Sequence, residues 1–138
     1  MTAVLDTSVL VRYLTLDPPS QGAAAQALID GEEALLVTSV ALAETGFALT
    51  RLYGVERAAA VDLLIELIER TNLTVLDLPT ARVVEALMLC RPSARVSFAD
   101  ALIWAAARNA GANVIYTFDQ RFPAAGLERR VLTDDGAS

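Results

Sequence analysis

Short apolar runs and longer segments with helical periodicity alternate along the chain. The apolar runs predict strands over 4–5, 35–38, 73–78, 113–117 and 131–132. Between them, apolar residues recur at the i, i+3, i+4 and i+7 positions of an amphipathic helix, as at Val61, Leu64, Ile65 and Ile68. The pattern therefore predicts a chain in which strands and helices follow one another in turn.

Capping and turn residues divide the helical segments. They predict helices over 9–14, 20–30, 39–53, 56–70, 79–90 and 97–109, with Ser20 and Ser97 as N-caps and Gly54 and Gly111 near helix ends. Strands that alternate with helices predict an α/β fold with a central parallel sheet of four or five strands and helices on both faces. We expect one domain over 1–138, because this length is ordinary for a single domain.

Composition narrows the classes of protein. Hydrophobic residues make up 54% of the chain, which is enough for a sizeable core. The chain has no uncharged apolar run long enough for a membrane helix and no basic leader with a cleavable apolar segment, so we expect a cytoplasmic protein. The net charge of −6 argues against nonspecific coating of nucleic acid. Cys90 is the single cysteine, so no intrachain disulfide is possible.

Four acidic residues interrupt apolar segments: Asp6, Glu44, Asp100 and Asp119. Asp6 and Asp119 follow predicted strands, whereas Glu44 and Asp100 lie near the starts of predicted helices. Since the carboxyl ends of parallel strands share one edge of a sheet, we expect all four to reach that edge. Glu44 is predicted to face the core, and the apolar helix after Asp100 is predicted to be buried. A carboxylate in such surroundings needs a partner.

A divalent cation is the simplest partner for such a group. The chain contains no histidine and no lysine, and all 11 of its basic residues are arginine. Hard cations such as Mg²⁺ or Mn²⁺ prefer oxygen ligands and usually serve phosphate chemistry. The hydroxyls of Thr7, Ser8 and Thr117 lie beside Asp6 and Asp119 in the sequence and are candidates to position ligands or substrate.

Each of these residues also has a purely structural explanation. Asp6 and Asp119 can cap the segments that follow them, and Asp100 stands three residues after Ser97 in a capping-box arrangement. The neighbouring hydroxyls can form ordinary turn and strand-end hydrogen bonds. An all-arginine basic set is also expected of a GC-rich genome, so it supports phosphate binding only weakly.

Three segments add a family resemblance: VLDTSVLVRYL, VTSVALAET and SFADALIWAAARNAGANVIYTFD. With them the chain resembles the PIN-domain nucleases and, more closely, the VapC-type toxins of bacterial toxin–antitoxin pairs. The resemblance implies a PIN fold and Mg²⁺- or Mn²⁺-dependent endonucleolytic cleavage of RNA. Asp6, Glu44, Asp100 and Asp119 match the acidic quartet of that family, with Asp6 and Asp100 as the most direct metal ligands. Thr117 matches a hydroxyl position of the family, whereas the loop RPSARVS lacks a glycine that many relatives carry.

The same resemblance implies an RNA substrate, a VapB-type antitoxin partner and a homodimer. Antitoxins of the family lay a peptide across the toxin and often insert a basic side chain near the acids. Four arginines close to the motifs in sequence are candidates for contacts with RNA phosphates: Arg12, Arg91, Arg95 and Arg121.

Three other functions compete with this interpretation. A noncatalytic PIN-like module would bind RNA or protein without cutting, and loss of a quartet acid would favour it. A haloacid-dehalogenase-like phosphatase needs a second Asp where Ser8 stands, and it needs a lysine. A DNA flap nuclease of this architecture needs a much longer chain. RNA cleavage therefore remains the favoured function.

Overall fold

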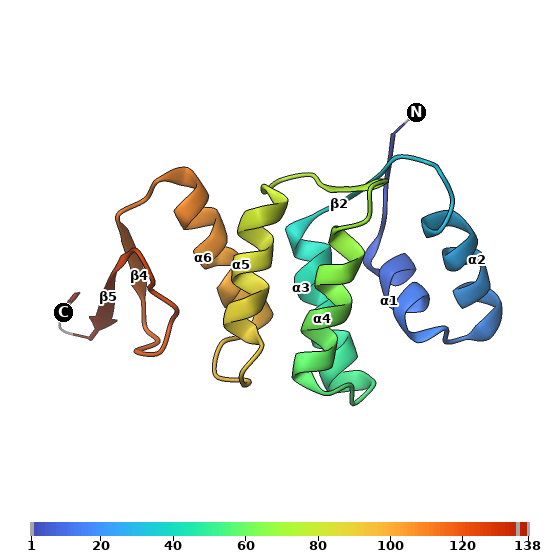
Figure 1. Cartoon of the computed structure of the whole chain (residues 1–138). Coiled ribbons are helices and arrows are strands. Elements are labelled where there is room, and N and C mark those ends of the chain that lie inside the picture. Colours follow the sequence, from blue (N-terminus) through green and yellow to red (C-terminus); the bar gives the residue numbers. More distant parts are fainter. Residues whose placement is uncertain (1, 135, 138) are drawn as a thin grey trace.

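The computed structural model describes residues 2–134 and 136–137 of the chain (Figure 1). The helices are α1 (Thr7–Thr15), α2 (Pro19–Ile29), α3 (Ser39–Phe47), α4 (Arg57–Ile68), α5 (Thr80–Cys90) and α6 (Phe98–Ala110), and a π-helical turn, η1 (Ala48–Leu52), follows α3. The strands are β1 (Ala3–Val4), β2 (Leu35–Val37), β3 (Leu73–Val75), β4 (Val114–Thr117), β5 (Glu128–Thr133) and β6 (Gly136–Ala137). The predicted alternation of strands and helices is confirmed. None of the helices described has the length and apolar character needed to cross a membrane.

The first three strands form one parallel sheet in the order β1-β2-β3. Leu35 lies opposite both Ala3 and Leu73, so the three strands are in register. Leu35 and Val37, which point to the same face of the central strand β2, are fully buried in the main core, whereas Leu36 on the other face is half-buried. All three strands point the same way, so the residues that follow them emerge at one edge of this sheet.

The remaining strands form a second sheet in the order β4-β5-β6, in which β4 is parallel to β5 and β6 is antiparallel. The α/β class with parallel strands is thus confirmed, but the strands do not join into one central sheet. Figure 1 shows β4 and β5 at one end of the molecule, whereas β1, α1 and α2 lie at the other. In the described residues, β1 and β4 each occupy the edge of their own sheet.

Contacts with α6 hold the second sheet in place. The Trp104 indole is buried and donates from Nε1 to the carbonyl oxygen of Ala125 at 2.9 Å. Arg108 Nη1 donates to the carbonyl oxygen of Gly126 at 3.0 Å, and Phe122 is buried in the same core as Trp104. The strands β4 and β5 therefore form one packed unit with α6.

The start of α6 is fixed in turn on α3, α4 and α5. A Cβ atom added to Gly46 of α3 would lie 2.7 Å from the Phe98 ring, so only glycine lets the ring approach this closely. The Arg57 guanidinium lies 4.6 Å from the centre of the same ring and donates to the carbonyl oxygens of Cys90 and Val96. These contacts determine where α6, and with it β4, lies relative to the first sheet.

Most helix boundaries agree with the sequence pattern, although α1 begins at Thr7, two residues before its predicted start. Ser97 caps α6 and Gly111 ends it in a left-handed conformation, as predicted. Ser20 is not a cap, because α2 begins one residue earlier with Pro19 in its first turn. The segment predicted as one helix over 39–53 changes to a π-helix at Ala48, where the Tyr53 N–H donates to the Ala48 carbonyl five residues before it.

The contact between Gly46 and Phe98 can be tested by Gly46→Ala. Alanine normally stabilises a helix relative to glycine, but here its methyl group would overlap the ring, so we expect a loss of about 1–3 kcal/mol in the free energy of unfolding. Denaturant unfolding would measure this loss. In a Phe98→Leu background the smaller side chain leaves room for the methyl group, so the same substitution should cost much less. Equal costs in both backgrounds would contradict the proposed steric origin.

Candidate functional site

Asp6 lies at the point where β1 leads into α1. Its backbone is extended, and its side chain caps the helix, with Oδ2 accepting from the Ser8 N–H at 3.3 Å and from the Ser8 Oγ at 2.6 Å. These bonds to the Ser8 side chain and backbone lower the pKa of Asp6 below its ordinary value of 3.8. Asp6 is therefore both an N-cap and an exposed, charged carboxylate at neutral pH.

Glu44 lies on α3, the helix that follows β2. The prediction that Glu44 faces the core is wrong: its side chain is exposed, as are Val40 (65%) and Phe47 (57%) on the same side of the helix. The Thr7 Oγ1 donates to Glu44 Oε1 at 3.0 Å and so links the start of α1 to α3. The apolar residues beside Glu44 suggested burial, but this apolar stripe lies on the surface of the protein.

Asp6 and Glu44 share a pocket at the carboxyl edge of the first sheet. The pocket has a volume of about 340 Å³. It is lined by Val4, Leu5, Asp6, Thr7, Thr38, Val40, Ala41 and Glu44. Two of the four predicted acids and one predicted hydroxyl residue thus meet here, where polar ligands have access from solvent.

Asp100 lies in the first turn of α6. Its N–H donates to the Ser97 Oγ at 3.0 Å, which is the capping interaction that the sequence offers as an alternative. The prediction that α6 is buried all round is wrong, because Ala99, Ile103 and Ala106 are exposed along one side. This side and α3 form an apolar groove of about 390 Å³ that includes Glu44 but not Asp100.

Asp119 follows β4 and belongs to the second sheet. Its N–H donates to the Thr117 Oγ1 at 3.0 Å, and its Oδ1 accepts from the Arg121 N–H at 2.8 Å. Both bonds close a local turn, so the structural role of Thr117 foreseen from the sequence is present. β4 lies in a different sheet from β1, and Asp119 does not line the pocket of Asp6 and Glu44.

The predicted meeting of all four acids is therefore absent within one chain. Across residues 2–134 and 136–137, no group of three or more acidic, histidine or cysteine side chains is arranged to hold a metal ion. The carboxylate and hydroxyl oxygens have the right chemistry for Mg²⁺ or Mn²⁺, but two carboxylates in one pocket are an incomplete set for the predicted site. The oxygen atoms of these residues therefore suit the ion chemically, but a single copy of the chain does not bring enough of them together to hold it.

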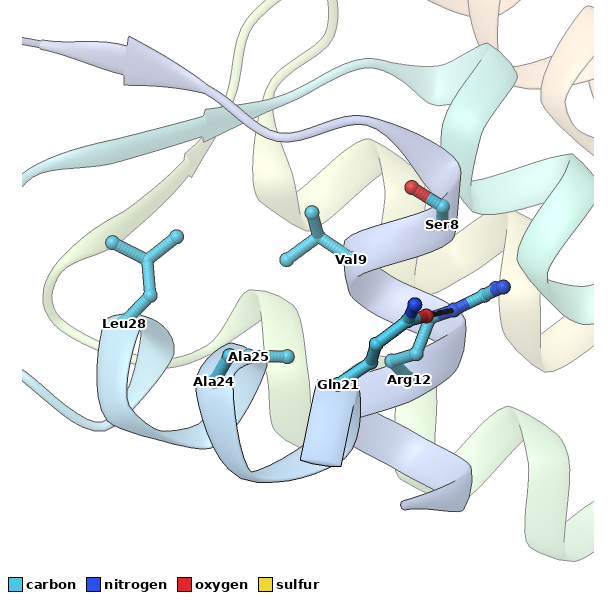
Figure 2. A pocket seen from close by; sticks show the side chains of 7 residues that line it. All are labelled: Ser8, Val9, Arg12, Gln21, Ala24, Ala25 and Leu28. Atoms are coloured by element: carbon cyan, nitrogen blue, oxygen red, sulfur yellow. Dashed lines mark hydrogen bonds between the residues drawn. The ribbon is translucent and has the colours of Figure 1, made fainter. Parts of the chain in front are cut away.

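The four candidate arginines lie in different surroundings. Arg12 lies on α1 one turn after Ser8, and its Nε donates to Gln21 Oε1 of α2 at 2.8 Å, as Figure 2 shows. Both side chains line a pocket of about 380 Å³ between α1 and α2 that reaches Ser8. Arg91 instead forms a two-pronged ion pair with Asp62, with both distances at 3.0 Å.

The two remaining arginines are exposed, Arg95 in the loop before α6 and Arg121 just after Asp119. Neither side chain forms an ion pair among the described residues. Arg121 lies two residues from Asp119, Arg95 five residues from Asp100 and Arg12 six residues from Asp6, so each can contribute positive charge near an acid.

Two polar residues near the site were not predicted. Gln21 orients Arg12, but nothing in the local sequence indicates this contact between helices. Asp77 accepts from the Ser39 N–H at 2.9 Å and from its Oγ at 2.5 Å, and so supports the start of α3. The sequence could have indicated Asp77, because it stands two residues after the last residue of β3, just as Asp6 stands two residues after β1.

The sequence of the chain matches a known family of proteins. The model of the PIN domain family matches residues 3–127. Among solved structures, the crystal structure of the sarcin–ricin-loop-cleaving toxin VapC20 of Mycobacterium tuberculosis is 28% identical in sequence. The match covers 92% of this chain and 96% of that one, with a TM-score of 0.42. A search of curated proteins finds no significant match.

The hydrogen bonds from Ser8 to Asp6 predict a change in titration. Ser8→Ala removes the hydroxyl donor, so the pKa of Asp6 should rise toward its ordinary value of 3.8, as measured by NMR titration of the carboxyl carbon. A lowered pKa in the folded state stabilises the fold above the unfolded pKa, and this contribution is lost as the pH falls through the folded pKa. The stability difference between wild type and variant should therefore be present at neutral pH and shrink in acid. The pKa of Asp62, which Arg91 lowers, should not change.

Proposed function

Because the chain belongs to the PIN domain family, we propose that it is a divalent-cation-dependent endoribonuclease and the toxin of a toxin–antitoxin pair. The proposal assigns catalysis to Asp6, Glu44, Asp100 and Asp119, all of which lie within the matched residues 3–127. Thr7, Ser8 and Thr117 would hold these acids or the substrate in position.

The observation that carries the proposal is the pairing of Asp6 with Glu44 at one sheet edge. Two carboxylates that reach one exposed pocket from different elements, with Thr7 bridging to one of them, serve no need of the core. Carboxylates gathered in this way repel each other unless positive charge is supplied. A divalent cation is the partner that suits their oxygen chemistry, and Mg²⁺ or Mn²⁺ is the proposed ion.

Individual arginines near the acids could bind the phosphates of an RNA substrate. The net charge of −6 gives no general attraction for nucleic acid, so phosphate contacts must be local. Arg12 is held beside Ser8 by Gln21, and Arg121 follows Asp119 directly in its turn, so each can contact a phosphate near an acid. Arg91 is a poorer candidate because Asp62 already occupies its guanidinium.

The apolar groove between α3 and α6 supports the toxin role. It presents Val40, Ala43, Leu102 and Ile103 beside the Glu44 carboxylate. An amphipathic peptide with a basic side chain would bury its apolar side in such a groove and pair its charge with Glu44. This is the chemistry proposed for an antitoxin of the VapB type.

One observation favours a noncatalytic module instead. A single chain gathers two of the four acids, and a protein that only binds RNA or another protein would need no more. A cleavage assay separates the two functions. A nuclease would cleave RNA and be stopped by EDTA, whereas a noncatalytic module would bind RNA or protein without cleavage.

Cleavage should depend on the acids. Asp6→Asn and Asp119→Asn should each lower the rate of RNA cleavage by about a hundredfold or more, because each removes a charge proposed to serve the reacting phosphate. The measurement is a gel assay on structured and single-stranded RNA with Mg²⁺ or Mn²⁺, repeated with EDTA, with folding checked by circular dichroism. Glu85→Gln is the matched control, since it removes an exposed ion pair with Arg82 away from the pocket and should leave the rate unchanged. Full activity of both site variants would exclude the assignment.

A further inference from the structure

We propose that two copies of this chain exchange their β4 strands, so that β4 of each copy pairs with β1 of the other. Asp119 of the second copy would then join Asp6 and Glu44 at the carboxyl edge of the first sheet. The strand exchange is inferred from geometry alone, whereas its consequence for catalysis rests on the proposed nuclease function.

Two unpaired strand edges are the first observation. The sheet orders leave one side of β1 and one side of β4 without a neighbouring strand among the described residues. The Ala3 and Leu5 N–H groups point toward β2, where they donate to the Ala34 and Leu36 carbonyls, so the Val4 N–H points the other way. Open edges of this kind are sites at which another strand adds. Both edge strands already pair in parallel, so a parallel β1–β4 pair would continue both sheets.

The positions of the acids give the register. β1 ends at Val4 and Asp6 follows two residues later; β4 ends at Thr117 and Asp119 follows two residues later. When Val4 lies opposite Thr117, Asp6 therefore lies opposite Asp119, across a strand spacing of about 4.8 Å. A single strand pairing thus places the acid of the second sheet beside the pocket of the first.

The chain's own β4 is held away from its own β1. Trp104 and Arg108 fasten the second sheet to α6, and Phe98 is fixed between Gly46 and Arg57 at the other end of that helix. Closing the sheet within one copy would require α6 to leave these contacts. A second copy can supply β4 while both copies keep them.

Exposed apolar side chains mark the surfaces that would be covered. Val4 is 58% exposed, Tyr116 is 56% exposed and Phe118 is 74% exposed, although all three belong to or adjoin edge strands. Large exposed apolar side chains beside an open strand edge indicate a surface that another chain covers. In the proposed register Val4 shares one face of the extended sheet with Thr117, and Tyr116 and Phe118 lie on the other face.

The turn that would arrive with β4 brings a positive charge together with the additional acid. The acids Asp6, Glu44 and Asp77 lie where the strands of the first sheet end. None of them forms an ion pair among the described residues. The incoming turn carries Arg121, which is exposed and lies two residues after Asp119. The arginine therefore arrives with the additional acid and offsets part of the repulsion among the carboxylates.

The exchange is symmetric and closes on itself. Each copy has one β1 edge and one β4 edge, so a two-fold pair satisfies both edges of both copies and leaves neither to bind a third chain. The result is a dimer with two identical sites, each built from both copies.

Cysteine cross-linking tests the strand pairing without reference to activity. In a Val4→Cys, Thr117→Cys variant the two Cα atoms would lie within disulfide range across the pair. The native Cys90 does not compete, because burial raises the pKa of its thiol to about 11. After ¹⁵N-labelled and unlabelled chains are refolded together and oxidised, we expect covalent dimers whose linked peptides mix the two isotopes. A bridge within one chain, or no bridge between these positions, would overturn the proposal.

Mixing inactive variants tests the shared site. Asp6→Asn and Asp119→Asn chains expressed together form mixed dimers with one doubly altered and one intact site, so about a quarter of wild-type RNA cleavage should return. Asp6→Asn with Glu44→Gln is the matched control, because both residues come from the same side of the site and no intact site can form. No recovery with the first pair, or equal recovery with both pairs, would overturn the shared site. If wild-type protein itself does not cleave RNA, the proposed function fails, and the cross-link still decides the strand exchange.

Discussion

The packing of Phe98 between Gly46 and Arg57 is the constraint on which the arrangement of this molecule depends. A glycine on α3 lets the ring approach the helix backbone, and the Arg57 guanidinium covers the ring while it binds two carbonyl oxygens of the connection between α5 and α6. Burial of an aromatic ring and pairing of buried carbonyl groups are both costly to reverse. The direction in which α6 leaves α3 follows from these contacts, and β4 lies where α6 carries it.

The divided sheet has an electrostatic consequence. Asp6 and Glu44 are each bound by a hydroxyl, from Ser8 and Thr7, and Asp119 is bound by the N–H of its own turn. Each carboxylate is thus stabilised locally, and Asp119 lies away from the other two. Bringing a third carboxylate to the pocket would raise the free energy of the protein through repulsion unless a cation offset it.

The sequence predicted the local structure well because local structure depends on nearby residues. The period of the apolar positions located every helix, and Ser97 and Gly111 marked the ends of α6 correctly. The sequence-based prediction was wrong where one face of a helix had to be assigned to the core or to the surface. Glu44 shares its stripe with Val40 and Phe47, and an apolar stripe looks the same whether a core or a partner covers it.

The pairing of strands could not be predicted for the same reason. The residues of β4 specify a strand, but they do not specify which strand it pairs with, because open strand edges present the same backbone groups. The choice between them depends on the segment between the strands, and here that segment includes the fixed helix α6. The four acids recognised in the sequence therefore remain a predicted set of oxygen ligands, and how they could come together depends on helix packing that the sequence does not reveal. If strand exchange assembles the site, the fraction of complete sites rises with protein concentration through mass action, and an antitoxin that covers the β1 edge would oppose assembly as well as block the pocket.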